Sequence, residues 1–288
     1  MTDARNAGWP RVASVSANLL ARDLGELLES PRWHPTRRCI SLVDIPTGRV
    51  FEITPGTHVV VEYSPGIAPL GAALPYKSGY LLVGAAGIWE WSPNGQTTLW
   101  ATIPHQPRIV SNDAVLHGGA VWVGRMDDHQ QPGAGSLWRI SPDTAQAVVA
   151  GLTLPNGLVA AHDGRDLLFA ESAARRIYRV ATHARDLDSV DLEPLLEVPD
   201  WIPDGLARDA SGHLWVARWG EGIVTRVATS SAPALDVTVP TPQTTAAAFD
   251  AQGALYITTG RESLDPMQRS SDPLAGSIFV VAAGDIEN

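Results

Sequence analysis

A short apolar pattern occurs six times along this chain of 288 residues. Each copy begins with a glycine or a polar residue and continues into apolar residues, as in Gly119-Ala-Val-Trp-Val and Asp166-Leu-Leu-Phe-Ala. The copies are residues 38–43, 79–83, 119–123, 166–170, 212–216 and 253–257. A period of forty-odd residues holds four short strands with their turns, and six such sheets close into a ring without long bare edges. The repeat therefore predicts an all-β, six-bladed β-propeller over residues 12–283, with residues 1–11 as an N-terminal extension.

The composition and the chain ends agree with this fold. The 26 glycines and 22 prolines are spread along the sequence, and charged residues make up 18%, against roughly 25% in an average domain, so long surface helices are not expected. A ring of sheets closes when both ends of the chain share a blade, and residues 12–20 can supply a strand beside residues 277–281. The leucines between Asn18 and Glu29 are also helically spaced, so an amphipathic helix there is the alternative.

Charge and apolar run length exclude several classes of partner. The 31 acidic and 21 basic residues give a net charge of −10, which repels a phosphate backbone, so we expect no nucleic-acid partner. The longest run of apolar residues and glycine, residues 79–89, is shorter than the roughly 18 to 20 residues that span a bilayer, so we expect no membrane association. The first residues, Met1-Thr-Asp-Ala-Arg, show no secretory pattern, and the single Cys39 cannot form an internal disulfide; we therefore predict a cytoplasmic protein.

Equivalent residues at the start of each innermost strand should face the axis of the propeller. They are spaced 41, 42, 44, 48 and 41 apart and are Glu29, Leu70, Asn112, Asn156, Asp204 and Thr245. Two carboxylates and two amides thus converge, and oxygen donors of this kind suit a hard divalent cation, which would also remove the repulsion between the acids. Alternatively, Asn112-Asp, Asn156-Gly and Asp204-Gly are only turn dipeptides. Four oxygen-bearing side chains in one register favour a metal site.

Several long stretches resemble the gluconolactonase, regucalcin (senescence marker protein) and luciferin-regenerating enzyme family, whose members are six-bladed propellers. They include ESPRWHPTRRCISLVDIPTGRVFEI from Glu29, SNDAVLHGGAVWVGRM from Ser111, LPNGLVAAHDGRDLLFAES from Leu154 and IPDGLARDASGHLWVARWG from Ile202. The resemblance implies a divalent-metal-dependent lactone hydrolase acting on a small molecule, with Glu29, Asn156 and Asp204 as metal ligands. It also implies that Asn112 faces the substrate or a metal-bound water.

The chemistry that this reaction needs is modest. A lactone is an activated ester, and a metal ion can polarise its carbonyl while acidifying a water molecule. We therefore expect Asp204 to act as ligand and proton acceptor, with Asn112 as a second catalytic residue. Calcium, magnesium, manganese and zinc all remain possible, because oxygen ligands favour hard ions but an open three-residue shell also suits zinc. A calcium-binding protein without turnover, and a biosynthetic enzyme that directs a cyclisation or isomerisation, remain alternatives.

One departure from the family concerns the substrate. Sugar-lactone members usually carry an arginine two positions before the ring asparagine of the third blade, where this chain has Val110, which predicts a less hydroxylated substrate. Arg125 and Arg218 end their second strands at one equivalent position and are candidate substrate-binding donors; the alternative is that they form surface salt bridges with nearby acids. Trp201 and Trp219 are expected to border the mouth and to suit an apolar or aromatic substrate. We expect a monomer or a weak homo-oligomer.

Overall fold

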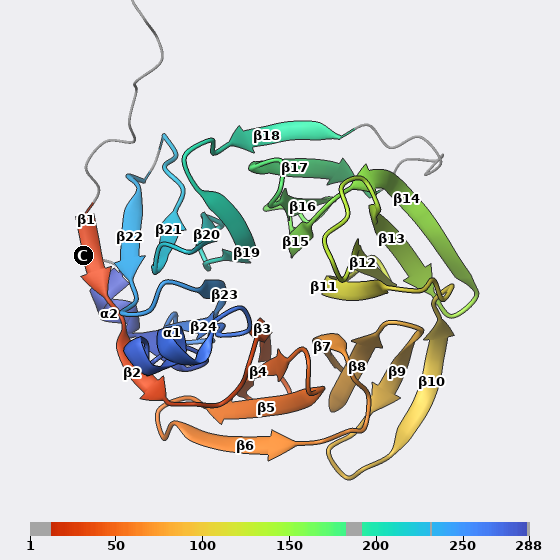
Figure 1. The fold of residues 1–288 in the computed structure, drawn as a ribbon, viewed down its shortest axis with the longest axis horizontal. Helices are drawn as coiled ribbons and strands as arrows, with labels where there is room; N and C mark the ends of the chain where they lie inside the picture. The colour runs from red at the N-terminus through yellow and green to blue at the C-terminus, as the bar shows by residue number, and fades with distance from the viewer. Residues whose placement is uncertain (1–12, 183–191, 231, 287–288) are drawn as a thin grey trace, which may run out of the picture.

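The computed structural model describes residues 13–182, 192–230 and 232–286. In these residues six small sheets surround one axis, and the chain passes from each sheet to the next around the ring (Figure 1). This arrangement confirms the six-bladed β-propeller. The predicted N-terminal extension, residues 1–11, lies outside the described residues. The helices of the described part, α1 (Pro266–Ser271) and α2 (Ala283–Ile286), are short, and none there has the length and apolar character needed to cross a membrane.

Blades 1 to 4 each consist of four consecutive strands, in which every strand pairs antiparallel with the next. The second strands of blades 1, 2 and 4 are buried along their whole length, whereas the fourth strands of the same blades are largely exposed. Blades 1 and 2 are β3 (Leu28–His34), β4 (Cys39–Asp44), β5 (Arg49–Thr54), β6 (Val59–Tyr63), β7 (Leu70–Tyr76), β8 (Gly79–Gly84), β9 (Gly87–Trp91) and β10 (Thr97–Thr102). Blades 3 and 4 are β11 (Ile109–His117), β12 (Ala120–Asp127), β13 (Gly135–Ser141), β14 (Thr144–Leu152), β15 (Pro155–Ala160), β16 (Asp166–Glu171), β17 (Arg176–Ala181) and β18 (Glu193–Glu197).

Blades 5 and 6 close the ring with the first two strands of the chain. Blade 5 comprises β19 (Ile202–Arg208), β20 (Leu214–Trp219), β21 (Ile223–Arg226) and β22 (Leu235–Thr238), and β1 (Ala13–Ser16) adds to it parallel to β22. Blade 6 comprises β23 (Thr244–Phe249), β24 (Leu255–Thr259), β25 (Ile278–Val281) and β2 (Asn18–Ala21), with β2 antiparallel to β25. The expected strand beside residues 277–281 is therefore present. The helical alternative is wrong, because the backbone of this segment pairs with open sheet edges.

The hydrophobic core lies between neighbouring blades. Ala72 and Val83 of blade 2 pack with Val121 and Val123 of blade 3, and all four side chains are fully buried. Elsewhere, Trp122 fills the space between blades 3 and 4 together with residues of β15 and β16. Because β-strands alternate their side chains between two faces, each sheet buries apolar side chains against both neighbours. This packing fixes the inner ends of the strands around the axis.

Candidate functional site

The residues that face the axis lie at an irregularity shared by all six innermost strands. The pairing register shifts between Glu29 and Arg32 in β3 and between Pro203 and Leu206 in β19. The corresponding shifts in β7, β11, β15 and β23 fall at the same place in the repeat. A β-bulge removes residues from the hydrogen-bonded ladder and redirects their side chains. Each innermost strand therefore has one short segment whose side chains can point into the channel.

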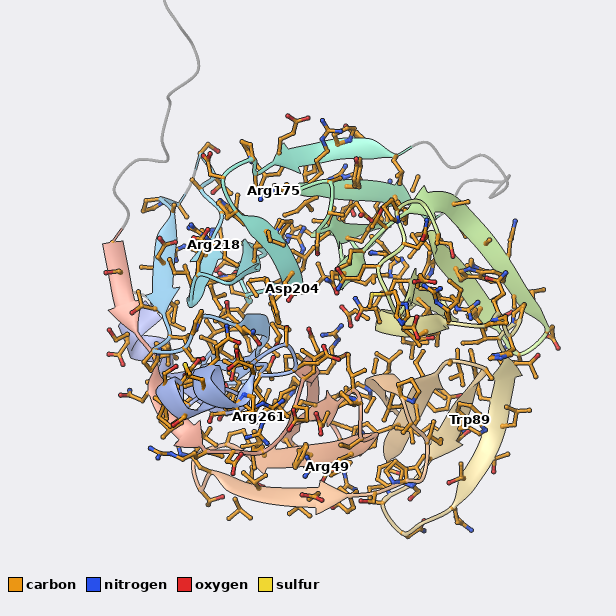
Figure 2. The ribbon with its side chains drawn as sticks, in the orientation of Figure 1. Arg49, Trp89, Arg175, Asp204, Arg218 and Arg261 are labelled. Carbon is orange, nitrogen blue, oxygen red and sulfur yellow. The ribbon has the colours of Figure 1, made fainter. Side chains whose placement is uncertain are left out.

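A pocket of about 570 Å³ lies at this end of the channel. Glu29, Asn112, Asn156 and Asp204 all line it, and Trp219 lines it as well. Figure 2 shows Asp204 at the inner edge of the ring. A larger cavity of about 910 Å³ lies beside the hairpins of blades 1 and 6, and none of the ring residues lines it. The pocket on the axis is thus the place where the oxygen-bearing residues of the repeat meet.

The two carboxylates of the ring lie in an environment that opposes their charge. Glu29 and Asp204 are 8% and 5% exposed, and within the described part of the chain neither forms an ion pair with a basic side chain. Burial raises the pKa of Glu29 to about 8, and the charge of Asp113 adds to the rise. Burial also raises the pKa of Asp204 well above its ordinary value, with further contributions from Glu29 and Asp113. A cation bound between these acids would stabilise both in their ionised form.

Asn156 is held by its neighbours in a defined orientation. Its Nδ2 donates to Ser172 Oγ at 2.9 Å, and Ser172 Oγ donates in turn to Pro203 O at 2.6 Å. Asn156 Oδ1 accepts a hydrogen bond from Asn112 Nδ2, which also donates to Pro155 O at 3.2 Å. Since one end of the amide is fixed by the serine, the oxygen end is directed to the side of the pocket where Asn112 lies.

Gly157 allows the two adjacent ring segments to approach each other. Its φ is +40°, and a Cβ at this position would lie 2.4 Å from the carbonyl oxygen of Asp204 and 2.7 Å from the backbone nitrogen of Leu206. A larger residue would push blades 4 and 5 apart at the level of the candidate ligands. The glycine that follows Asn156 therefore has a steric role in the site, in addition to its role in a turn.

The two remaining ring positions contribute no group to the pocket. Leu70 is fully buried in a hydrophobic cluster with Val43 and Tyr80. Thr245 is also fully buried, and its Oγ1 donates to Leu28 O at 2.6 Å. The oxygen donors of the ring are thus confined to blades 1, 3, 4 and 5.

Arg32 crosses the channel farther along β3. Its Nη2 donates to Asp113 Oδ1 at 2.9 Å and to Ala114 O at 3.0 Å. Asp113 Oδ2 accepts from the backbone nitrogen of Leu158 at 2.8 Å. These bonds connect blades 1, 3 and 4 and place a partly buried ion pair across the channel. Asp113, which sequence reasoning passed over, is therefore an axial acid, but its charge is matched by Arg32.

The expectation that Arg125 lies at the pocket rim is wrong. Its side chain is completely buried, with Nη1 donating to Pro104 O at 3.1 Å and Nη2 donating to Ala85 O at 3.2 Å. The guanidinium lies over the Trp138 ring, 5.4 Å from its centroid. Successive side chains of a strand point to opposite faces, and the next residue, Met126, is the one that lines the pocket. Arg125 thus links blades 2 and 3.

Trp201 and Arg218 also lie away from the pocket. Trp201 is 3% exposed and packs in the core between blades 4 and 5, while the following residue, Ile202, lines the pocket. Arg218 lies over the Trp201 ring, 5.0 Å from its centroid, and forms an ion pair with Glu221, which is the salt-bridge alternative. Figure 2 shows Arg218 farther from the axis than Asp204. Of the two tryptophans, Trp219 is the one that borders the pocket.

Sequence reasoning missed several residues that line the pocket. Glu262 and Ser263 belong to the connection between β24 and β25, which has no counterpart in the aligned repeats and so carried no signal. Ser172 was detectable, because it shares its repeat position with Arg125 and Arg218. Its short polar side chain at the end of a buried second strand is the feature that could have indicated a partner for the ring.

Comparisons with known proteins place this geometry in a family. A pentonolactonase from Haloferax volcanii is 29% identical over 262 residues, which cover 87% of this chain and 89% of that protein. An L-arabinolactonase from Azospirillum brasilense is 26% identical over 273 residues, covering 92% and 91%. The crystal structure of regucalcin, a calcium-binding protein from Agrobacterium tumefaciens, is similar with a TM-score of 0.83 at 26% identity, and 94% of each chain is covered. The model of the SMP-30/Gluconolactonase/LRE-like region matches residues 27–261, and the chain therefore belongs to the SMP-30/gluconolactonase/LRE-like family.

Proposed function

We propose that this protein is a divalent-metal-dependent lactonase that hydrolyses a small lactone bearing few hydroxyl groups. The observation that carries the proposal is the pair of buried, mutually repelling carboxylates, Glu29 and Asp204, which share one pocket with the oriented Asn156 amide. The relatives named pentonolactonase and L-arabinolactonase support the reaction class. The likeness to a regucalcin described as calcium-binding supports a divalent cation.

The donor set of the pocket fits such a cation. Two carboxylates and one amide oxygen are hard ligands, and a positive charge between the acids would stabilise their ionised forms and so counteract the rise in pKa that burial and mutual repulsion cause. Glu29, Asn156 and Asp204 would hold the ion, leaving positions open for water and substrate. When bound, it would polarise the lactone carbonyl and lower the pKa of a water molecule.

The side chains of the pocket can carry the remaining steps. Asp204 accepts a proton from the attacking water as the water oxygen bonds to the carbonyl carbon. The ring C–O bond then breaks, and the proton passes to the departing alkoxide, so that the product is a hydroxy acid. Asn112 lines the pocket beside Asn156. Because both hydrogens of its Nδ2 are engaged, with Asn156 Oδ1 and Pro155 O, its Oδ1 is the atom available to accept a hydrogen bond from the attacking water or from a hydroxyl of the lactone.

The wall of the pocket favours a substrate with few hydroxyl groups. Much of its lining is apolar, from Leu27, Met126, Leu154, Ile202 and Trp219. Val110, at the position where sugar-lactone members carry an arginine, pairs with Met126 in the sheet and supplies no donor. A pocket built to hydrogen-bond a substrate hydroxyl binds a substrate without that hydroxyl poorly, because its own polar group is then left unpaired. An apolar wall instead accepts a hydrocarbon surface at little cost in free energy.

A lactone panel with defined metal content tests the proposal. Protein treated with a chelator should lose activity and regain it with calcium, magnesium, manganese or zinc added singly. Asp204→Asn should lower kcat/KM by about a hundredfold or more, as expected when a general base is lost, and should lower the metal content. Asp200→Asn, an exposed acid in the same segment, is the matched control.

Two outcomes of this panel would contradict the proposal. Full activity in the metal-free protein would exclude the metal-dependent reaction. Metal binding that stabilises the fold while no lactone is turned over would instead indicate a calcium-binding protein, the class to which the regucalcin neighbour is assigned by its description. Separately, a cytoplasmic location stays a prediction that fractionation of cells can check.

A further inference from the structure

The charged residues that line the pocket are all acidic. Within the described part of the chain they are Glu29, Asp204 and Glu262, and no lysine, arginine or histidine joins them. The first two are placed to hold a cation. Glu262 differs, because it is exposed at the edge of the pocket and makes no hydrogen bond or ion pair among the described residues. A divalent cation would offset the two buried acids and leave the charge of Glu262 uncompensated.

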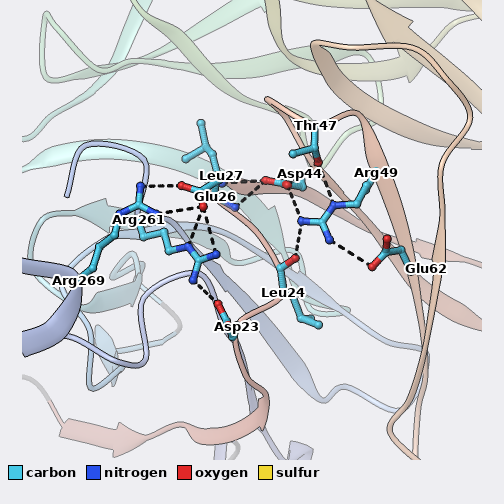
Figure 3. A network of polar contacts seen from close by, with 10 residues as sticks. All are labelled: Asp23, Leu24, Glu26, Leu27, Asp44, Thr47, Arg49, Glu62, Arg261 and Arg269. Carbon is cyan, nitrogen blue, oxygen red and sulfur yellow. Dashed lines mark hydrogen bonds and ion pairs between the residues drawn. The ribbon is translucent and has the colours of Figure 1, made fainter. Parts of the chain in front are cut away.

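The arginines near Glu262 are engaged elsewhere. Arg261 forms ion pairs with Asp23 and, at 3.1 Å, with Glu26, and Arg269 binds Glu26 at 2.7 Å. Figure 3 shows both guanidinium groups turned toward these acids. Both arginines of the connection between β24 and β25 are paired with these acids, so neither of them forms an ion pair with Glu262.

The backbone of the same connection is fastened at both of its ends. Arg261 donates from its backbone nitrogen to Glu26 O at 2.7 Å, and Gly260 forms a bridge with Leu27. At the other end, the backbone nitrogens of Leu24 and Gly25 donate to Gly276 O at 2.9 and 3.3 Å. Glu262 is therefore presented by a supported segment beside Leu27 and Glu29, and its place at the pocket is set by the fold.

The acids nearest to Glu262 are paired with arginines, Glu26 with Arg261 and Arg269 and Asp44 with Arg49, so among the described residues Glu262 carries the unpaired negative charge at this edge of the pocket. Partial withdrawal from water raises the pKa of its carboxyl, and the charges of Glu26 and Asp44 add to the rise. Asp44 also accepts hydrogen bonds from the backbone nitrogens of Glu26 and Leu27, as Figure 3 shows, so its carboxylate is fixed close to this side of the pocket. A second anion approaching here would meet repulsion that no basic residue of the lining relieves.

We propose that Glu262 is a specificity-determining residue that selects uncharged lactones, or lactones bearing an ammonium group, against lactones that carry a carboxylate. Its carboxylate accepts a hydrogen bond from a hydroxyl or ammonium substituent and repels an anionic one. The same repulsion acts on the hydroxy acid product, which becomes an anion at neutral pH, and favours its release. This inference rests on the proposed lactonase function.

The test compares two γ-butyrolactones that differ only in a carboxamide or a carboxylate substituent. The wild-type protein should prefer the carboxamide by kcat/KM. Glu262→Gln should reduce this preference about tenfold at low ionic strength, the scale expected for one unit charge near a partly exposed site, and the difference should shrink in high salt. Glu193→Gln, an exposed change of the same kind on the outer strand β18, should leave the preference unchanged. A preference in Glu262→Gln within twofold of wild type at low salt would overturn the proposal.

A binding measurement separates this inference from the reaction. Calorimetry with 4-hydroxybutyrate, the hydrolysis product of unsubstituted γ-butyrolactone, should show affinity for calcium-loaded Glu262→Gln about tenfold higher than for the wild type. If no lactone is hydrolysed but this gain is found, the lactonase proposal fails while the role of Glu262 in charge selection stands. If hydrolysis is found and the variant binds the anion no better than the wild type, the inference about Glu262 fails alone.

Discussion

Replacing Ser172 with alanine removes the support of Asn156 without altering any candidate ligand. The change deletes the acceptor of the 2.9 Å bond from Asn156 Nδ2 and the donor of the 2.6 Å bond to Pro203 O. Ser172 is 4% exposed and Asn156 7%, so water cannot readily replace either bond. An unpartnered buried polar group costs about 1 to 3 kcal/mol. In a protein of this size that loss lowers the melting temperature by roughly 2 to 6 °C.

The change in calcium affinity tests whether Ser172 orients the Asn156 amide. With the serine gone, the Asn156 amide can rotate and present its NH2 group where the oxygen was. Loss of a residue that orients a ligand typically lowers metal affinity about 10- to 100-fold. Calorimetric titration of the chelator-treated protein with calcium measures this change directly, and thermal unfolding of the same sample measures the stability.

Thr259→Val is the matched control. Thr259 occupies the same repeat position in blade 6, is fully buried, and donates from Oγ1 to Ser277 O at 2.7 Å, and within the described residues it forms no hydrogen bond with a ring donor. Its loss should lower stability on a similar scale and leave calcium affinity unchanged. Equal calcium affinities for Ser172→Ala and wild type, or an equal drop in both variants, would refute the reasoning that the serine orients the ligand.

Two further predictions follow from buried charges. Arg125→Ala should lower the free energy of unfolding by about 2 to 5 kcal/mol, because it opens a cavity and leaves Pro104 O and Ala85 O without donors; lactone KM should not change. Denaturant unfolding beside steady-state kinetics checks this, and a raised KM in a stably folded variant would contradict it. The pKa of Glu29 is raised to about 8 from 4.5, so between these values the folded metal-free protein binds a proton that the unfolded chain has released. The free energy of unfolding should therefore decrease as the pH rises from about 5 to about 8. Cation affinity should rise over the same range, by up to about tenfold per pH unit for each proton displaced; titrations in buffers of different ionisation enthalpy measure the proton release, and a pH-independent affinity would argue against it.

The fold could be predicted from the sequence because the spacing of the repeat reflects the length of one blade. Blades of nearly equal length must place equivalent residues at equivalent depths along the axis, and this was sufficient to bring Glu29, Asn112, Asn156 and Asp204 to one pocket. Whether these residues bind metal stays a prediction. The alignment of the repeats does not predict which face of the sheet a side chain occupies at the end of a strand.

The errors at Arg125 and Trp201 have this common cause. Each is adjacent to a residue that lines the pocket, Met126 and Ile202, and a shift of one residue in a strand exchanges the two faces of the sheet. Glu262 was missed for a different reason. It belongs to a connection that the repeat does not contain, so its position depends on ion pairs between residues more than 200 apart in sequence.

The way in which the ring closes also has a consequence for biosynthesis. Strands β1 and β2 are made first, but their partners β22 and β25 are among the last parts of the chain to be synthesised. At about 5 to 20 residues per second, the first strands wait on the order of 10 to 50 seconds before pairing is possible. During this interval they present free edges, which are open to association with other chains. The sequence of β1, Ala-Ser-Val-Ser, is short and half polar, whereas β2, Asn-Leu-Leu-Ala, contains two leucines. Of the two strands that await their partners, β2 therefore offers the larger apolar surface to a neighbouring nascent chain.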